Sequence, residues 1–215
     1  MERRYSTSHE GDNGRLYETK RKPMSEISTT LKQALAGAVE TIQSLDKLEA
    51  PLQRAADLIV ECLNPGNKLL VCGNGGSAAD AADFCTEFAC RFMHDRRPFP
   101  ALNLSQGGSL LTATGNDYGF EEIFARQVAA YGKSGDVLIA ITTSGKSENI
   151  KRSLETAKER DLKTIALLGR DGGTTIGIAD VDLVVPGNST ARIQEAHKFL
   201  LHVLCEAVEA RLPRA

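Results

Sequence analysis

The stretch AITTSGKS, residues 140–147, contains residue types that bind phosphate in many proteins. It differs from the P-loop of nucleotide hydrolases, G-x-x-x-x-G-K-[ST], because Ala140 stands where that motif has its first glycine. The missing glycine removes the first tight turn, and no apolar strand ends in an evident Mg²⁺-binding aspartate. Hydrolysis of ATP or GTP is therefore disfavoured, and Lys146 need not be a catalytic lysine.

Hydroxyl groups, and not the lysine, characterise this loop, because four of the six positions from 142 to 147 carry one. The four are Thr142, Thr143, Ser144 and Ser147. Hydroxyls and backbone N–H groups at the start of a helix can bind a monophosphate without a metal ion. The loop is therefore predicted to bind a small phosphorylated metabolite, and Lys146 is expected to be solvated.

A second glycine-rich loop, CGNGGSAAD, occupies residues 72–80. Its GNGGSA core satisfies G-x-G-x-x-A, a form of the dinucleotide-binding fingerprint. That fingerprint requires an acidic residue about 20 residues further on, at the end of the next strand, and the stretch PALNLSQGG has none. Both loops are instead expected to lie at the carboxyl ends of parallel strands, where ligands bind. The alternative is that their glycines and serines only cap helices.

Apolar segments with the character of strands alternate with segments of helical periodicity over most of the chain. The expected strands are 68–72, 100–104, 137–141, 163–168 and 181–185. The expected helices are 25–45, 52–62, 76–92, 107–114, 120–131, 147–160 and 190–212. This alternation predicts an α/β fold with a parallel sheet covered on both faces.

The two ends of the chain add to this pattern. Residues 1–23 carry many charges and few aliphatic side chains, so we expect a flexible N-terminal extension, and residues 24–215 are expected to form one domain. The two N-terminal helices and the long last helix are additional to the sheet and could build an oligomer interface.

The composition argues against several kinds of partner. A net charge of −2 offers no basic field for nucleic acid or an anionic membrane, and the absence of tryptophan disfavours base stacking. No apolar run approaches the roughly 20 residues that span a bilayer. We therefore expect neither a nucleic-acid partner nor a membrane partner.

The chain has five cysteines, which form no C-x-x-C pair and are odd in number. They are Cys62, Cys72, Cys85, Cys90 and Cys205. Most lie in apolar stretches, so buried free thiols are expected instead of disulfides. This cysteine usage favours the reducing cytoplasm.

Five segments together resemble the SIS (sugar isomerase) domain family, in particular the phosphoheptose isomerases. The segments are CGNGGSAADA (72–81), TGNDYGFEEIFARQV (114–128), GDVLIAITTSGKSENI (135–150), LLGRDGG (167–173) and ARIQEAHKFLLHVL (191–204). The resemblance runs from about Ser25 to Leu212. It implies a flavodoxin-like three-layer sandwich, a homotetramer with active sites at subunit interfaces, and a role in bacterial heptose synthesis. The implied reaction converts sedoheptulose 7-phosphate to D-glycero-D-manno-heptose 7-phosphate.

The same resemblance implies roles for individual residues. Contacts to the sugar phosphate are implied for Asn74, Gly75, Gly76 and Ser77, and contacts to the sugar chain for Asn116 and Asp117. The hydroxyls of the second loop, Thr142, Thr143, Ser144 and Ser147, match the phosphate cradle. Glu87 matches the general base, His202 its partner acid/base, and Gln194 a residue that contacts the substrate and, in some members, a zinc ion.

These roles suit the chemistry of aldose–ketose isomerisation, which moves a proton between C1 and C2 through an enediolate. The reaction needs a base at the carbons and a group that manages protons at the oxygens, and no organic cofactor. Glu87 lies among apolar neighbours, which favours a function over a solvated surface position. His202 follows Gln194 by eight residues, so both can share a broad helical face. His197 is expected to be an exposed helix residue.

One position departs from the zinc-binding members, which carry a histidine four residues before the base where this chain has Asp83. Asp83 and Glu87 share one helical face. Together with Gln194 and His202 they could still hold Zn²⁺ or another divalent ion. Alternatively, the two carboxylates repel each other and raise the pKa of one, which helps a base act without metal.

Two functions without turnover compete with catalysis. Some proteins of this subfamily are scaffolds, such as the DnaA-binding initiator-associating protein, and a third possibility is a sensor that binds a sugar phosphate. The presence of Glu87, Gln194 and His202 together favours the enzyme, because a scaffold has no need for all three.

Overall fold

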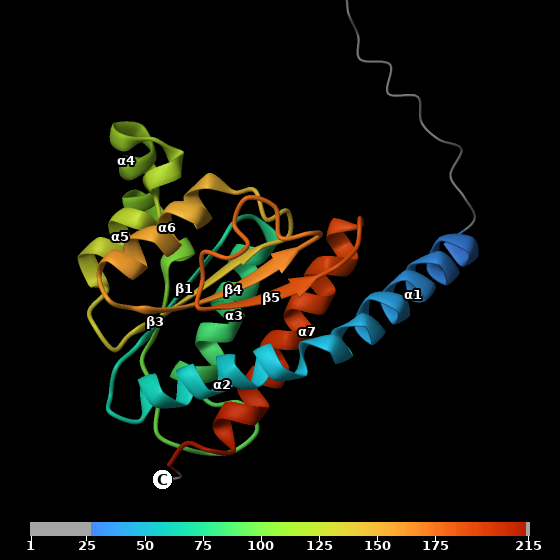
Figure 1. The fold of residues 1–215 in the computed structure, drawn as a ribbon, viewed down its shortest axis with the longest axis horizontal. Coiled ribbons are helices and arrows are strands. Elements are labelled where there is room, and N and C mark those ends of the chain that lie inside the picture. Colours follow the sequence, from blue (N-terminus) through green and yellow to red (C-terminus); the bar gives the residue numbers. More distant parts are fainter. Residues whose placement is uncertain (1–26, 214–215) are drawn as a thin grey trace, which may run out of the picture.

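A five-stranded parallel sheet with the order β2-β1-β3-β4-β5 forms the centre of the computed structural model, which describes residues 27–213 (Figure 1). The strands are β1 (Leu69–Gly73), β2 (Ala101–Asn103), β3 (Val137–Thr142), β4 (Lys163–Gly169) and β5 (Val181–Val185). The α-helices are α1 (Ile27–Gln43), α2 (Glu49–Leu63), α3 (Gly76–Ala89), α4 (Gly108–Tyr118), α5 (Ala125–Tyr131), α6 (Glu148–Glu159) and α7 (Thr190–Glu209). Three short 3-10 helices connect them: η1 (Ser44–Leu48), η2 (Leu104–Gln106) and η3 (Phe120–Glu122).

This strand order is the flavodoxin-like one, and helices cover both faces of the sheet, so the predicted α/β sandwich is confirmed. The strands are almost continuously apolar because both of their faces are covered. In β1 and β3 every residue is buried. Since successive side chains of a strand point to opposite faces, Leu69 and Leu70 belong to two different core clusters.

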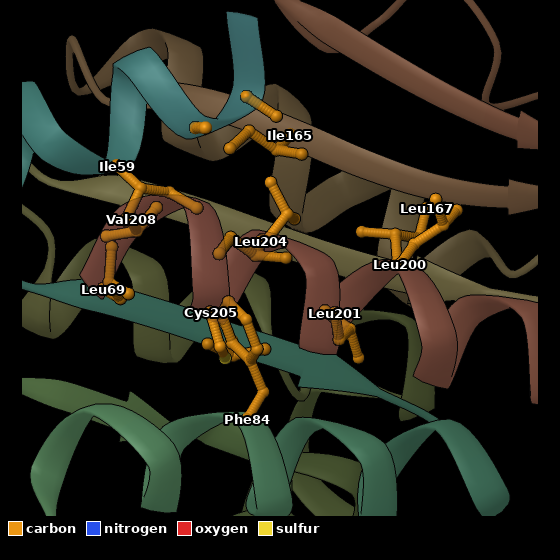
Figure 2. Close-up of a cluster of buried hydrophobic side chains, with 14 of the residues drawn as sticks. Ile59, Leu69, Phe84, Ile165, Leu167, Leu200, Leu201, Leu204, Cys205 and Val208 are labelled. Atoms are coloured by element: carbon orange, nitrogen blue, oxygen red, sulfur yellow. The ribbon is translucent and has the colours of Figure 1, made fainter. Parts of the chain in front are cut away.

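Helices α2, α3 and α7 supply the core on one face of the sheet (Figure 1). Figure 2 shows this cluster, in which Ile59 of α2, Phe84 of α3 and Leu204 of α7 pack with strand residues such as Leu69. Helix α7 is therefore an integral part of this layer. Its contacts with α3 also position the candidate catalytic residues.

The other face of the sheet is covered mainly by α5 and α6. Phe124 and Val128 pack there with Leu154 of α6 against the remaining strand side chains. The two clusters pack on opposite faces of the strands, and the loops before α3 and α6 begin at the carboxyl edge of this sheet.

Helix α1 extends beyond the body of the molecule, and none of its residues is buried (Figure 1). Four large apolar side chains at intervals of four residues are exposed on it: Ile27, Leu31, Leu35 and Val39. Ile27 is 83% exposed. An apolar stripe of this kind suits a helix that packs against another protein surface.

The predicted strand 181–185 coincides with β5, whereas the predicted helix 76–92 is too long, because α3 ends at Ala89. The carboxylate of Glu209 explains this early end. It accepts hydrogen bonds from the backbone N–H groups of residues 92–94 at 2.9–3.2 Å, which holds that segment in a turn. A side chain more than 100 positions away thus overrides the local helical pattern.

Several other expectations concern the chain as a whole. The predicted extension 1–23 lies outside the described residues. Within residues 27–213, no helix combines the length and the apolar character needed to cross a membrane. All five cysteines are free, and all except Cys90 are buried, so the expected burial holds for four of them. Burial raises the pKa of the Cys72 thiol to about 12, which makes this thiol unreactive.

Candidate active site

The two predicted phosphate loops leave neighbouring parallel strands, β1 and β3, which pair with Gly73 opposite Ile141. Two reciprocal hydrogen bonds join the loop regions. The Asn74 amide Nδ2 donates to Asn149 Oδ1 at 2.9 Å, and Asn149 Nδ2 donates to Asn74 Oδ1 at 2.9 Å. Both loops thus follow the carboxyl ends of parallel strands, as predicted, and the structure also joins them to each other.

The loop after β1 is held from both sides. Ser105 accepts a hydrogen bond from the Gly73 N–H at 3.1 Å and donates one to the Gly73 carbonyl at 2.9 Å. At the start of α3, a Cβ on Gly76 would collide with the side-chain amide of Gln194. Gly76 thus leaves room for the Gln194 side chain of α7 at the N-terminus of α3. Gly75, at φ +55°, makes the turn between strand and helix.

The hydroxyls of the loop after β3 face one another. Thr142 Oγ1 lies 3.3 Å from Ser144 Oγ and 3.1 Å from Ser147 Oγ. Ser147 is the N-cap residue of α6 but makes no capping hydrogen bond. The first N–H groups of this helix therefore lack the usual side-chain partner at the N-cap, which favours the binding of an anion. Lys146 is exposed, as expected.

Helices α3 and α7 lie side by side with their residues in parallel register. Gly76 lies against Gln194, Asp80 against Lys198, and Asp83 against His202. The Nε2 atom of His202 is 3.6 Å from Asp83 Oδ2. This register places Glu87, one turn beyond Asp83, on the part of α3 that faces His202 and the residues following it. The structure thus brings together the two helices that carry the predicted base and acid.

A lysine that the sequence reading did not include stands between these residues. The ammonium of Lys198 donates to Asp83 Oδ2 at 2.5 Å and lies 3.4 Å from Asp80 Oδ1. The hydrogen bond from Lys198 holds the pKa of Asp83 below its usual range. Partial burial disfavours the charged lysine, but the two carboxylates outweigh it and raise the pKa of Lys198. Because the pKa of Asp83 is lowered, Asp83 is not the carboxylate whose pKa repulsion between the two was predicted to raise.

Lys198 and Gln194 line an open pocket of about 470 Å³ beside α3. The buried Asp80 lines it too, and its Oδ2 atom has no hydrogen-bond partner among the described residues. The other carboxylate oxygen of Asp80, Oδ1, is the one that lies near the Lys198 ammonium. The pocket therefore combines a cation, an amide and an acceptor, which suits a polyhydroxylated ligand.

Glu87 is half-buried, and its backbone is fixed by Arg96. The guanidinium of Arg96 donates to the Glu87 carbonyl at 2.6 Å and to the Phe88 carbonyl at 3.0 Å. Arg96 is itself paired with Glu209 of α7 at 3.0 Å, and both side chains are almost fully buried. The end of α3 is thereby tied to α7. The pKa of the Cys205 thiol on α7 is raised by burial first and then by the charge of Glu87, in keeping with that proximity.

The donor set fits a zinc ion poorly. The Asp83 oxygen that faces His202 is already hydrogen-bonded to the Lys198 ammonium, and a dication there would have to displace that group. No group of three or more histidine, cysteine, aspartate or glutamate side chains within residues 27–213 is arranged to hold a metal ion. We therefore derive no step through a metal.

Two predicted site residues lie apart from these clusters. Asn116 and Asp117 are exposed near the end of α4, and the Asn116 amide donates to Asp117 Oδ1 at 2.7 Å. Among residues 27–213, no hydrogen bond or ion pair joins them to the two loops or to the α3–α7 pair. Their predicted contact with the sugar chain remains a prediction.

The expectation for His197 is wrong, because this side chain is fully buried. Its face of α7 packs on the sheet, so the polar residue type does not mark the solvent side. Within residues 27–213, neither ring nitrogen makes a hydrogen bond of standard geometry, although the ring interacts with the backbone of Leu168. Burial lowers the pKa of His197 to about 4, although the nearby backbone of Leu168 opposes part of this effect.

Comparison with known proteins bears on this geometry directly. The family model for the SIS domain matches residues 35–169, which include both predicted phosphate loops and α3. The chain belongs to the SIS domain family. Within it, the chain is 47% identical over 183 residues to a phosphoheptose isomerase of Citrifermentans bemidjiense, covering 85% of this chain and 95% of that protein. A phosphoheptose isomerase of Shewanella loihica is 43% identical over 186 residues, with coverage of 85% and 94%.

Solved structures of this family superpose on the chain. The phosphoheptose isomerase GmhA from Neisseria gonorrhoeae matches with a TM-score of 0.80 and 42% identity, covering 86% of this chain and 99% of that one. A phosphoheptose isomerase from Francisella tularensis gives a TM-score of 0.78 and 39% identity, covering 86% and 97%. These similarities confirm the predicted membership of the phosphoheptose isomerases and the predicted enzyme class, an isomerase.

The sequence reading missed the residues that hold this site together. These are Asp80, Arg96, Ser105, Asn149, Lys198 and Glu209. For Lys198 a signal existed, since it lies four residues after Gln194 and four before His202 and therefore shares their helical face. The others pair across elements that only the folded chain brings together.

Proposed function

We propose that the chain is an aldose–ketose isomerase that converts sedoheptulose 7-phosphate to D-glycero-D-manno-heptose 7-phosphate. The contact between Asp83 and His202 carries this proposal, because it brings His202 to the face of α3 from which Glu87 projects one turn later. The identity of 43–47% to phosphoheptose isomerases supports the choice of substrate.

In the proposed reaction, the Glu87 carboxylate removes a proton from C1 of the ketose. The electron pair of that C–H bond forms the C1–C2 double bond, and negative charge moves to the oxygen on C2, where His202 donates a proton. His202 then accepts the proton of the O1 hydroxyl, while Glu87 returns its proton to C2. The carbonyl group thus moves from C2 to C1 with no net gain or loss of protons or electrons.

The terminal phosphate of the substrate is assigned to the hydroxyl loop. Thr142, Ser144 and Ser147 would donate hydrogen bonds to it, and the start of α6 favours its negative charge. The first loop, with Asn74, Gly75, Gly76 and Ser77, would contact the sugar phosphate, and Gln194 the sugar itself. Holding the phosphate at one end leaves the reacting carbons to the α3–α7 pair.

The decisive experiment is an assay of purified protein with sedoheptulose 7-phosphate, in which the aldose product is detected by NMR or mass spectrometry. E87Q should lower kcat by about 100- to 10,000-fold, because the proton-abstracting group is lost, while binding of the sugar phosphate persists. E159Q, an exposed glutamate on α6, is the matched control and should leave kcat unchanged. Binding without turnover by the wild-type chain would identify a sensor or scaffold instead.

We further propose that the chain forms a homotetramer with active sites at its subunit interfaces. The apolar stripe of α1 supports this proposal, because its large side chains are exposed within a single subunit. Subunit contacts are also a route by which Asn116 and Asp117 could reach the sugar chain. A place in heptose biosynthesis in the cytoplasm follows from the proposed substrate.

A further inference from the structure

The α3–α7 cluster contains a fixed positive charge that the reaction as described above does not use. Lys198 lies on the face of α7 that also carries Gln194 and His202. Its ammonium contacts Asp83 at 2.5 Å and Asp80 at 3.4 Å, so two carboxylates from α3 hold one cation. The side chain is 33% exposed and lines the pocket that it shares with Gln194.

The hydrogen-bonding capacity of this group is not exhausted by its partners. An ammonium has three N–H donors, and the two carboxylates account for two of them. The third can donate into the pocket that Lys198 lines together with Gln194 and Asp80. A ligand oxygen in this pocket would complete the hydrogen bonding of the ammonium.

We propose that Lys198 is the electrophile of the active site, whose ammonium stabilises the negative charge on the substrate oxygens in the enediolate. This inference rests on the isomerase function proposed above. An enediolate carries its charge on O1 and O2, and a fixed cation at those oxygens lowers the barrier without having to reorganise during the reaction. Asp80 and Asp83 keep the ammonium in place, and Asp83 keeps it beside His202.

The same arrangement indicates a positioning role for Asp83. A carboxylate at this position, one that binds Lys198 and faces His202, is suited to orient an ammonium. Lys198 therefore supplies from the protein the positive charge for which a divalent ion would otherwise be needed. The reaction should accordingly proceed in the presence of a strong chelator.

The test compares K198M with K151M. Lys151 is a matched control, because it is 32% exposed and also lies between two carboxylates, at 3.9 Å from Glu148 and 3.8 Å from Glu155, but on α6. Steady-state kinetics with sedoheptulose 7-phosphate are measured with chelator present. We expect the wild type to keep its full activity in chelator and K151M to match it. In K198M, kcat should fall about 100- to 1,000-fold, whereas KM should change less than about threefold. The small change in KM reflects phosphate binding by the other loop.

A second measurement does not depend on turnover. The zinc content of wild type and D83N is determined after dialysis against Zn²⁺, and equal contents are expected because Lys198 occupies the Asp83 oxygen. Stoichiometric zinc in wild type that is lost in D83N would overturn the inference, as would an undiminished kcat in K198M. In both cases the proposed function stands, provided that wild type converts the substrate. Absence of turnover in wild type overturns the proposed function and, with it, the catalytic role of Lys198.

Discussion

Asn74 and Asn149 exchange two side-chain hydrogen bonds, each 2.9 Å long, although 75 residues separate them in the chain. Asn74 follows β1, and Asn149 lies in the first turn of α6. Each amide donates once and accepts once in this contact. The pair fixes the distance between the loop assigned to the sugar phosphate and the hydroxyl loop. It also occupies the side chain of Asn74, which leaves the backbone of that loop for contact with a ligand.

Removing one amide of this pair should weaken substrate binding. N149A leaves the Asn74 side chain without its partner, so KM for the sugar phosphate should rise about tenfold with a smaller change in kcat. N64A, at an exposed asparagine after α2, should leave KM unchanged. The pairwise origin of the effect is checked with N74A and the double variant, for which a coupling energy of about 0.5–3 kcal/mol is expected. Strictly additive effects would contradict a direct role of the pair.

The hydroxyl of Thr142 should contribute to phosphate affinity, because it contacts both Ser144 and Ser147 in the loop. T142V keeps the shape of this buried side chain and removes the hydroxyl. The inhibition constant of inorganic phosphate should rise about five- to tenfold, in line with the loss of about 1 kcal/mol for one hydrogen bond. K146M should change it less than about twofold, since Lys146 is exposed. A larger effect in K146M than in T142V would show that the lysine binds the phosphate.

The exposed stripe on α1 should control oligomer formation. Leu31 and Leu35 are each 56% exposed, so L31E/L35E adds charge to the stripe without disturbing the core. Light scattering should find a mass below that of the wild-type oligomer, with an unchanged circular dichroism spectrum. The control K32E/Q33E changes exposed polar residues of the same helix and should keep the wild-type mass. Equal masses for wild type and L31E/L35E would remove α1 from the interface.

Local features of the sequence were sufficient to predict the parallel sheet and the position of both candidate phosphate loops after its strands. The strands are apolar runs, and each loop combines glycine or hydroxyl residues at the start of a helix, so neighbours in the sequence carry the signal. The pairs Asn74–Asn149 and Asp83–Lys198 could not be predicted in this way. Each pair joins residues from different elements. The Asn74–Asn149 contact depends on the register between β1 and β3, and the Asp83–Lys198 contact depends on the register between α3 and α7. The same reason explains why α3 ends early, since Glu209 reaches residues 92–94 from another helix.

His197 illustrates a further limit of the sequence reading, because the periodicity of α7 leaves it on the buried face despite its polarity. Its environment has a consequence for stability. The pKa of His197 falls from an ordinary 6.5 to about 4 in the folded chain, because burial disfavours the charged ring. The unfolded chain therefore binds a proton between these two values that the folded chain does not bind. The contribution of the neutral His197 ring to the free energy of unfolding is complete above about pH 6.5 and is lost progressively as the pH falls towards 4.

H197L should remove this pH dependence, because leucine occupies the buried site without titrating. Between about pH 7.5 and pH 5, the wild-type free energy of unfolding should fall by about 2 kcal/mol more than that of H197L. Chemical denaturation at the two pH values measures both quantities, and the comparison cancels groups that titrate in both proteins. H94L, at an exposed histidine, should keep the full wild-type dependence. An equal loss of stability in wild type and H197L would contradict this prediction. It would mean that the folded chain can protonate the buried ring without losing stability.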